Sequence, residues 1–359
     1  MRILQVCSVN TFGGGERHLA DLSRALVDLG HEVYAASSPG SPLWTELSFV
    51  NDENLFALSR ANYVKNVIGL AGFVRAHGIE IVHAHAARDY HRAALVVRLA
   101  SRGRLVLTRH ALFPLRAINR PLLKDAGRVI AVSQAVAKSV QQSGVVESSK
   151  ITVVHNGIDV DRFERSNDRD LPIIAGTVGH LAPIKGQDIF LRAAALMSAR
   201  RGGVRFVVVG EDKSPHLSYR RCLESLITEL DLSEIVSMPG WHDDIPALLS
   251  SLTVFVSAAR SEPFGLAIVE AMAAGLPVVA TASEGALEII EDGTTGRLVP
   301  ADDPEALAQA INDLLDDPLE RARLGNNAQR VARERYSLKR MAKDTERVYC
   351  EVLVSVSAI

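Results

Sequence analysis

Two carboxylates eight positions apart, Glu262 and Glu270, are the side chains whose types and spacing are most informative for chemistry. Glu262 precedes a Pro-Phe-Gly turn, whereas Glu270 is the only charge in the apolar stretch 265–274. That stretch predicts a helix, which Gly275 ends and Pro277 keeps from resuming. A carboxylate in such a helix is costly unless it is paired or hydrogen-bonded. Glu270 therefore indicates either a bound, hydroxyl-rich ligand or, as the simpler alternative, a nearby arginine or solvent.

The predicted start of this helix has the chemistry of a phosphate site. The backbone N–H groups of Phe264, Gly265 and Leu266 would lack helical acceptors, and the helix dipole places positive charge there. Amides for phosphate, Glu270 for hydroxyls and Glu262 outside the helix would together suit a nucleotide sugar.

Histidines end two apolar segments that predict buried strands. His83 and His85 close one segment, and Arg109 and His110 close the next. Ligands of a doubly wound sheet bind at such strand ends. No third ligand completes a metal-binding spacing here, so no metal site is expected. We interpret His110 as a catalytic or substrate-contacting imidazole and His83 as a hydrogen-bonded structural residue.

A glycine-rich loop, Gly13–Glu16, follows the first predicted strand. It lacks the G-x-G-x-x-G spacing, and residues 36–38 (Ala-Ser-Ser) stand where an NAD-binding protein has an acidic residue. The loop is therefore expected to admit a phosphate or a sugar rather than NAD. In the second half of the chain, Lys185 precedes Gly186 and would present a point charge to a diphosphate, although a solvated loop lysine fits the same pattern.

Short apolar strands alternate with helical stretches along the whole chain, which predicts parallel, doubly wound sheets. The first series ends near residue 154, and a second begins at residue 173. We therefore predict an α/β fold of two Rossmann-like domains, residues 1–165 and 166–336, that face a central cleft.

The composition is that of a globular protein with a large core, since 47% of the 359 residues are hydrophobic and 23% are charged. The formal net charge of -2 gives no reason to expect nucleic acid as a partner. Cys7, Cys222 and Cys350 form no metal-binding pattern and are expected to be free thiols. With neither a signal peptide nor a membrane-spanning stretch recognised, a cytoplasmic location is expected.

Charge is unevenly distributed along the sequence. Residues 88–128 hold ten Lys/Arg against two acids, and residues 284–320 hold eleven acids against Arg297 alone. Solvated helix faces would explain both clusters. The basic segment, which includes Arg116, also carries apolar residues between its cations, and that combination suits an anionic membrane surface.

Several motifs, in this order and spacing, resemble the retaining glycosyltransferases of family four (glycosyl transferases group 1), which have the two-domain architecture called GT-B. The resemblance covers essentially the full length. It rests on the stretches 13–16 with 29–33, 155–159, 185–186, 209–211 and 239–241, on the Glu262/Glu270 pair, and on 288–296.

The resemblance implies roles for individual residues. Glu270 would hold the ribose hydroxyls, Glu262 would meet the donor sugar, and Lys185 would stabilise the leaving diphosphate. His110 would lie at the sugar, and the last helix, within residues 337–359, would pack back on the first domain. The expected nucleotide-sugar site comprises Gly14, Gly15, His180, Lys185, Gly210, Trp241, Glu262, Phe264, Gly265, Leu266 and Glu270, and the expected acceptor side comprises His85, Arg109 and Arg116.

One position departs from the family pattern, because His180 stands where the family usually has arginine. A protonated His180, or Arg109, would have to supply the missing charge. The implied function is metal-independent, cofactor-free transfer of a sugar from a UDP-sugar first, or a GDP-sugar second, to a glycan or lipid-linked acceptor of cell-envelope polysaccharide biosynthesis. The enzyme would work in the cytoplasm or peripherally on the inner membrane face. A sugar phosphorylase, a nucleotide-sugar epimerase and a non-catalytic nucleotide-sugar binder remain alternatives.

Overall fold

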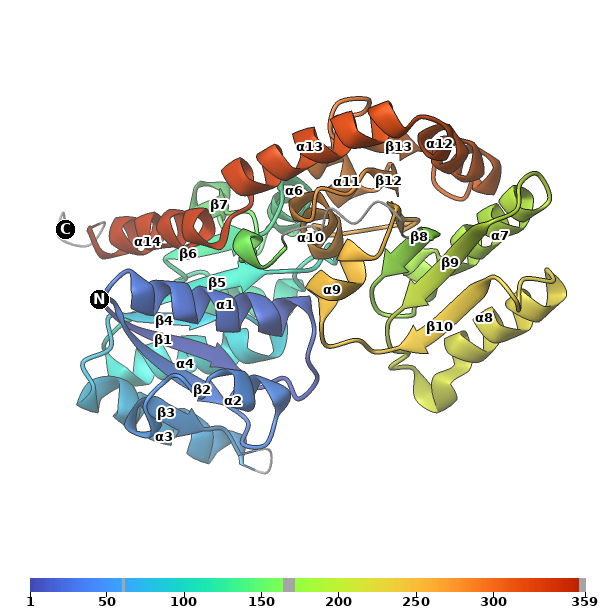
Figure 1. Cartoon of the computed structure of the whole chain (residues 1–359). Helices are drawn as coiled ribbons and strands as arrows, with labels where there is room; N and C mark the ends of the chain where they lie inside the picture. Colours follow the sequence, from blue (N-terminus) through green and yellow to red (C-terminus); the bar gives the residue numbers. More distant parts are fainter. Residues whose placement is uncertain (60–61, 164–171, 355–359) are drawn as a thin grey trace. The chain divides into compact units, whose positions relative to one another are not determined.

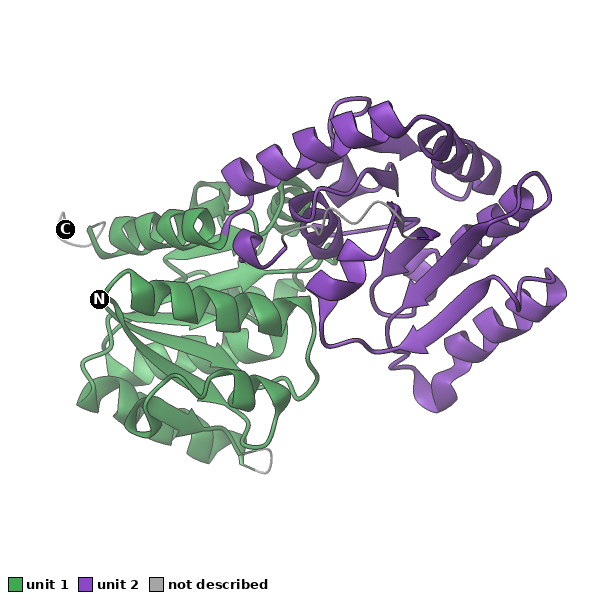
Figure 2. Cartoon of the chain, viewed as in Figure 1, with its two compact units in different colours: residues 1–157, 338–359 green, residues 158–337 purple. Residues whose placement is uncertain are grey.

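The computed structural model describes residues 1–59, 62–163 and 172–354 of the chain. It divides into two compact units, residues 1–157 with 338–359 and residues 158–337 (Figure 2). Each unit is built on one parallel sheet with helices packed around it (Figure 1), which confirms the predicted fold class. In the described part of the chain, no helix combines the length and apolar character that crossing a membrane requires.

The first unit carries a seven-stranded sheet in the order β3-β2-β1-β4-β5-β6-β7. Its strands are β1 (Arg2–Cys7), β2 (Glu32–Ser37), β3 (Leu55–Ala57), β4 (Ile81–Ala84), β5 (Arg104–Arg109), β6 (Arg128–Ala131) and β7 (Ile151–Val153). Its helices are α1 (Gly14–Asp28), α2 (Pro42–Glu46), α3 (Tyr63–Ala76), α4 (Ala87–Ala100), α5 (Arg120–Leu123), α6 (Gln134–Gln142) and α14 (Leu338–Val354).

The strand order reverses between β1 and β4, because the chain first builds outward through β2 and β3 and then returns to the other side of β1. At such a switch point the connections leave in opposite directions and open the carboxyl edge of the sheet to a ligand. A buried carboxylate fixes this edge: Asp89 on α4 accepts hydrogen bonds of 2.8 and 2.7 Å from the backbone N–H and the hydroxyl of Ser8, which follows β1.

The last helix, α14, belongs to this first unit although it follows the whole second unit in the sequence. Its buried face includes Tyr349, whose hydroxyl lies 2.6 Å from Nδ1 of His83 on β4. Nε2 of His83 lies 2.6 Å from the hydroxyl of Thr108 on β5. His83 is therefore fully hydrogen-bonded inside the core and ties the C-terminal helix to the centre of the first sheet.

The second unit carries a six-stranded sheet in the order β10-β9-β8-β11-β12-β13. Its strands are β8 (Ile173–Val178), β9 (Val204–Val209), β10 (Val236–Gly240), β11 (Val254–Ser257), β12 (Val278–Thr281) and β13 (Arg297–Val299). Its helices are α7 (Gln187–Ser198), α8 (Ser218–Glu229), α9 (Ile245–Ser250), α10 (Leu266–Ala273), α11 (Glu284–Ile289), α12 (Pro304–Asp316) and α13 (Pro318–Arg335). The switch point of this sheet lies between β8 and β11.

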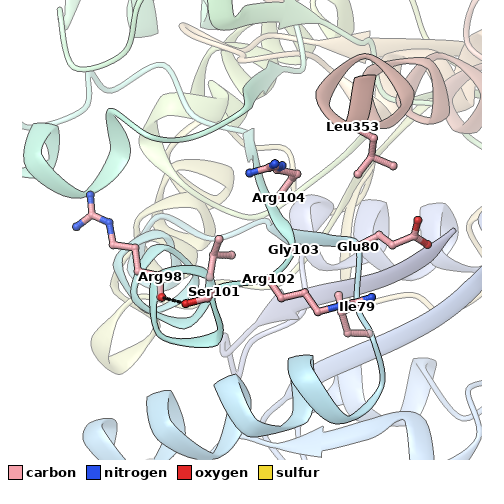
Figure 3. Close-up of a pocket in the computed structure, with 9 residues that line it drawn as sticks. Ile79, Glu80, Arg98, Ser101, Arg102, Gly103, Arg104 and Leu353 are labelled. Carbon is pink, nitrogen blue, oxygen red and sulfur yellow. Dashed lines mark hydrogen bonds between the residues drawn. The ribbon is translucent and has the colours of Figure 1, made fainter. Parts of the chain in front are cut away.

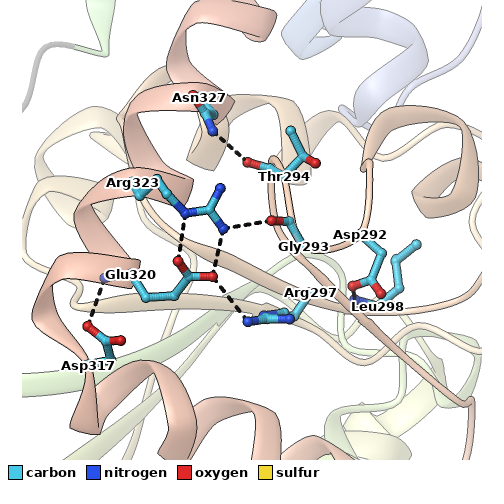
Figure 4. Close-up of polar contacts among 9 residues, drawn as sticks. All are labelled: Asp292, Gly293, Thr294, Arg297, Leu298, Asp317, Glu320, Arg323 and Asn327. Atoms are coloured by element: carbon cyan, nitrogen blue, oxygen red, sulfur yellow. Dashed lines mark hydrogen bonds and ion pairs between the residues drawn. The ribbon is translucent and has the colours of Figure 1, made fainter.

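A charged network holds the loop before β13 against α13 (Figure 4). Glu320 pairs with Arg323 at 2.7 Å and with Arg297 at 3.1 Å. Arg323 also donates to the carbonyl of Gly293, and Asn327 donates to that of Thr294. These contacts hold the backbone of the loop before β13. They do not involve the residues at the carboxyl edge of the sheet.

The sequence analysis missed two short strands, β3 and β13. Each has only three residues and lacks a β-branched run. The equally short β7 was predicted because the residues 151–154 (Ile-Thr-Val-Val) are all β-branched. The predicted domain boundary at residues 165 and 166 lies outside the described residues. The units change at 157/158, where the N–H of Ile158 donates to the carbonyl of Tyr336 at 2.9 Å and so joins Ile158 to the second unit.

The docking of α14 predicts a stability effect for Tyr349→Phe. The substitution removes the hydroxyl and leaves Nδ1 of His83 buried without a partner, a loss of about 1–3 kcal/mol. Urea unfolding followed by circular dichroism measures the free energy of unfolding. Tyr63→Phe is the matched control, because Tyr63 is 43% exposed, and a change within about 0.5 kcal/mol is expected there. Equal losses for the two variants would contradict this role of Tyr349.

Burial of His83 also predicts a pH dependence. Burial, with a smaller contribution from His18, holds the pKa of His83 well below its usual value. The unfolded chain therefore binds this proton first, so stability is lost as the pH falls below about 6.5, by up to about 1.4 kcal/mol per pH unit. Urea unfolding between pH 7.5 and pH 5 should give a shallower slope for His83→Gln than for the wild type, and an unchanged slope would refute the assignment.

Candidate active site

Two residues predicted from distant motifs meet at the switch point of the second sheet. Lys185 closes the turn after β8, and Glu262 lies in the loop after β11. Nζ of Lys185 lies 2.5 Å from Oε2 of Glu262, and both side chains are partly exposed. The pair is accessible to a ligand at the edge where a doubly wound sheet binds one.

Backbone contacts fix the loops that carry this pair. Gly186, at a φ of 66°, lies so close to the next loop that a Cβ would be 1.9 Å from the carbonyl oxygen of Ala258. The guanidinium of Arg260 donates to both carboxylate oxygens of Asp188, at 2.9 and 2.8 Å. Only glycine fits at position 186, so Lys185 and Glu262 are held by rigid surroundings.

The turn between Glu262 and α10 is equally constrained. Gly265 is the N-cap of α10 with a φ of 110°, and a Cβ there would lie 3.5 Å from Cγ of Glu262. The N–H of Gly285 donates to the carbonyl of Glu262 at 2.8 Å. Phe264 is buried, with its ring 5.8 Å from that of Tyr336. The structure thus places Glu262, Gly265 and Leu266, the first residue of α10, at one helix N-terminus.

Glu270 is the fifth residue of α10, one turn beyond Leu266, and is 9% exposed. It is the only carboxylate among the buried residues of this helix. Its burial agrees with the pattern from which it was predicted, because every other member of that buried set is apolar. The helix thereby presents one acidic group in its second turn.

The other predicted donor residues lie at neighbouring strand ends. Gly210 follows β9 with a φ of 151°, and a Cβ there would lie 1.8 Å from the carbonyl oxygen of Gly179. His180 follows Gly179, and burial, with the charges of Lys213 and Lys185, lowers its pKa. Trp241 follows β10, is 48% exposed and donates from Nε1 to Asp243 at 2.7 Å. His180 therefore adds no charge near neutral pH unless an anion raises its pKa.

In the first unit, the glycine loop lies beside the predicted catalytic imidazole. A Cβ at Gly15 would lie 3.6 Å from the ring of His110, and Gly14, the first residue of α1, is exposed. His110 follows β5 directly. Gly15 thus keeps this side of the His110 ring free of a side chain.

Two histidines complete the surroundings of His110. His85 follows β4, and its Nε2 lies 2.7 Å from Oε1 of Gln5 on β1. His18, on α1, places its ring 4.8 Å from that of His110 and 5.5 Å from that of His85. Burial lowers the pKa of His18 to about 4, an effect that Asn156 weakly opposes. Burial also holds the pKa values of His85 and His110 well below their usual range, so all three imidazoles are neutral at pH 7.

Sequence reasoning missed His18, Gln5 and Asn156. His18 lies one turn beyond Gly14, on the buried face of α1, and that spacing was the only local signal for it. Gln5 is a polar residue in the middle of an apolar strand, which also marks a position with a polar neighbour.

The two remaining residues predicted for the acceptor side, Arg109 and Arg116, differ in solvent exposure. Arg109 ends β5, is buried and donates to the carbonyl of Phe113, so it shapes the following loop. Arg116 lies in that loop and is exposed. The same loop exposes Phe113 and Ile118, 77% and 78% respectively.

One cavity of the first unit lies elsewhere. It has a volume of about 460 Å³ and opens near the residues that precede β4 and begin β5, at the amino edge of the sheet (Figure 3). Its polar lining includes Glu80, Arg98, Arg102 and Arg104. None of the predicted site residues lines this cavity.

Comparison with known proteins places these features in a family. The model of Glycosyltransferase Family 4 matches residues 12–162, and that of Glycosyl transferases group 1 matches residues 159–331. The D-inositol 3-phosphate glycosyltransferase of Streptomyces scabiei is 30% identical over 305 residues, which are 75% of this chain and 67% of that protein. Its counterpart in Mycobacterium tuberculosis is 34% identical over 214 residues, which are 56% and 44%. The chain spans about half to two thirds of the length of these curated relatives.

Solved structures agree with the sequence relatives. Anabaena HepE, in complex with UDP and glucose, is 25% identical and superposes with a TM-score of 0.84 over 100% of both chains. A glycosyltransferase from Rickettsia africae shares the fold, with a TM-score of 0.86, 24% identity and 98% coverage of both chains. The chain therefore belongs to the group 1 glycosyltransferases, the family-four type with the GT-B fold.

Proposed function

We propose that the protein transfers a sugar, with retention of anomeric configuration, from a UDP-sugar to a phosphorylated or lipid-linked glycan acceptor of cell-envelope polysaccharide biosynthesis. A GDP-sugar is the second choice of donor. The observation that carries the proposal is the 2.5 Å Lys185–Glu262 pair beside the N-terminus of α10, at the switch point of the second sheet. HepE, whose complexes contain UDP and UDP-glucose, supports UDP as the nucleotide.

The chemical task is to stabilise a diphosphate as it leaves the sugar. A cation held in place beside helix N–H groups supplies preorganised charge for such a leaving group. In our proposal, Glu262 orients Lys185 before the donor binds. The diphosphate then replaces Glu262 as the ion-pair partner of the Lys185 ammonium. Glu270, one turn along α10, would accept hydrogen bonds from the ribose hydroxyls. No metal is needed in this scheme, because the ammonium and the amides provide the positive charge.

The first unit would receive the sugar and the acceptor. His110, which lies beside Gly15, is neutral and can accept or donate a hydrogen bond to a sugar hydroxyl. The basic loop with Arg116 suits an acceptor that carries phosphate. Inositol 3-phosphate is the first acceptor to test, because the curated relatives are named for it.

The donor site predicts selective stabilisation by one nucleotide. Thermal unfolding with UDP, GDP and ADP, each with and without EDTA, should show a shift of several degrees with UDP that survives EDTA, since a ligand at a hundred times its Kd adds about 2.7 kcal/mol. Glu270→Gln should abolish the shift. Glu305→Gln, an exposed acid on α12, is the control and should retain it. Absence of a shift with every nucleotide would contradict the donor assignment.

The exposed loop also predicts membrane attachment. We propose that the docking loop (Phe113, Arg116, Ile118, Arg120 and Lys124) inserts its two apolar side chains into an anionic bilayer while its cations meet the headgroups. Neutralising its three cations should weaken co-sedimentation with anionic liposomes about a hundredfold, at about 1 kcal/mol per charge. Arg333→Gln, exposed on α13, should leave binding unchanged. Unaltered binding of the triple variant would refute attachment through this loop.

A further inference from the structure

Three imidazoles from separate elements of the first unit converge at the carboxyl edge of its sheet. His18 comes from α1, His85 follows β4 and His110 follows β5. One ring nitrogen of each lies within 4.8 Å of the corresponding nitrogen of the other two. The rings of His85 and His110 are nearly parallel, with centroids 6.2 Å apart and an angle of 26° between their planes. The three nitrogens therefore surround one point in space.

Within the described ranges 1–59, 62–163 and 172–354, these nitrogens form no hydrogen bond of good geometry, although the side chain of Asn156 lies close enough to His18 to act on its pKa. Four buried ring nitrogens lack such a bond: Nδ1 and Nε2 of His18, Nδ1 of His85 and Nε2 of His110. His18 and His85 are themselves 4% and 5% exposed. Buried polar atoms are nearly always satisfied, so several unsatisfied nitrogens from three histidines clustered this closely indicate a missing ligand.

The neighbouring histidine shows that burial alone does not produce this situation. His83 lies on β4 two residues before His85, with its ring 4.0 Å from that of His85. Both of its nitrogens are bonded to hydroxyls, those of Tyr349 and Thr108. The core thus satisfies both nitrogens of the structural histidine, whereas each of the three histidines at the carboxyl edge keeps at least one unsatisfied nitrogen.

The tautomer of His85 leaves one ring nitrogen available to bind a metal ion. Because Oε1 of Gln5 is an acceptor, the 2.7 Å contact assigns the proton of His85 to Nε2. Nδ1 is then left with a free lone pair directed away from Gln5. An outer hydrogen bond of this kind fixes the tautomer and raises the ligand strength of a metal-binding imidazole.

We propose that His18, His85 and His110 form a binding site for a transition-metal ion of the Zn²⁺ type, with a fourth position open to water or an anion. Three neutral imidazoles with an open position match a common zinc coordination. Tetrahedral coordination at Zn–N distances near 2.05 Å places the nitrogens about 3.3 Å apart, so the rings must close in by rotation about their side-chain torsions. Metal would occupy His110 and so inhibit the proposed transfer, which needs no metal.

Direct binding tests the site without any assay of transfer. Metal-free protein is titrated with Co²⁺, whose visible absorption reports four-coordinate geometry, and with Zn²⁺ against a chromogenic chelator. We expect one ion per chain, bound at least a hundredfold more weakly by His18→Leu and by His110→Asn. Gln5→Ala should weaken binding about ten- to a hundredfold through the lost outer hydrogen bond. His91→Ala, a histidine on α4 outside the cluster, should bind as the wild type does.

Each other outcome overturns the proposal. A wild type that binds Co²⁺ no more tightly than His18→Leu would mean that ordered water satisfies the three nitrogens. An equal loss in His91→Ala would mean that binding is not at this site. His110 is only half-buried, so His110→Asn keeps the test decisive if His18→Leu fails to fold, as judged by its thermal unfolding. The UDP-dependent thermal shift tests the donor site separately, because Glu270 and Lys185 lie in the second unit and the three histidines in the first.

Discussion

The reversal of strand order in each parallel sheet is the constraint on which the candidate site depends. Successive crossovers cover the faces of the sheet, but at β1/β4 and at β8/β11 they leave in opposite directions. The carboxyl ends of these strands are then the positions where loops can carry polar groups without disturbing the apolar core. Lys185 and Glu262 lie at one such point, and His85 lies at the other.

The two sheet edges present different chemistry. At the edge of the second sheet, Lys185 and Glu262 form an ion pair, and both side chains are partly exposed to solvent. At the edge of the first sheet, burial holds three imidazoles in the neutral form. A charged edge suits a diphosphate, whereas a neutral edge of hydrogen-bonding groups suits hydroxyls or a metal ion. The proposed transfer and the proposed metal site both follow from this contrast, and they compete for His110.

Glycines fix the backbone around the charged edge. Gly186 and Gly285 each pass so close to a neighbouring carbonyl that a Cβ would lie 1.9 or 2.1 Å from it. Such contacts hold the loops of Lys185 and Glu262 without help from the ligand. A preorganised site of this kind loses less free energy on binding than a flexible one.

The sequence by itself determined the parts of the protein whose signals are local. The alternation of strands and helices, the lone carboxylate of α10, and Lys185 after β8 could be predicted because each depends on a few consecutive residues. The short strands β3 and β13 gave no local signal, because neither contains the run of β-branched residues that marks the equally short β7.

Only the tertiary structure decided how distant groups meet. The ion pair joins Lys185 to Glu262 across two strand ends. His18 reaches His85 and His110 because α1 follows β1, which pairs with β4, and β4 pairs with β5. The sequence shows no metal ligands at short spacing, and the metal site proposed above instead uses histidines that are far apart in the chain. Packing brings such ligands together from separate elements, and burial then sets their ionisation, so neither property can be read from neighbours in the chain.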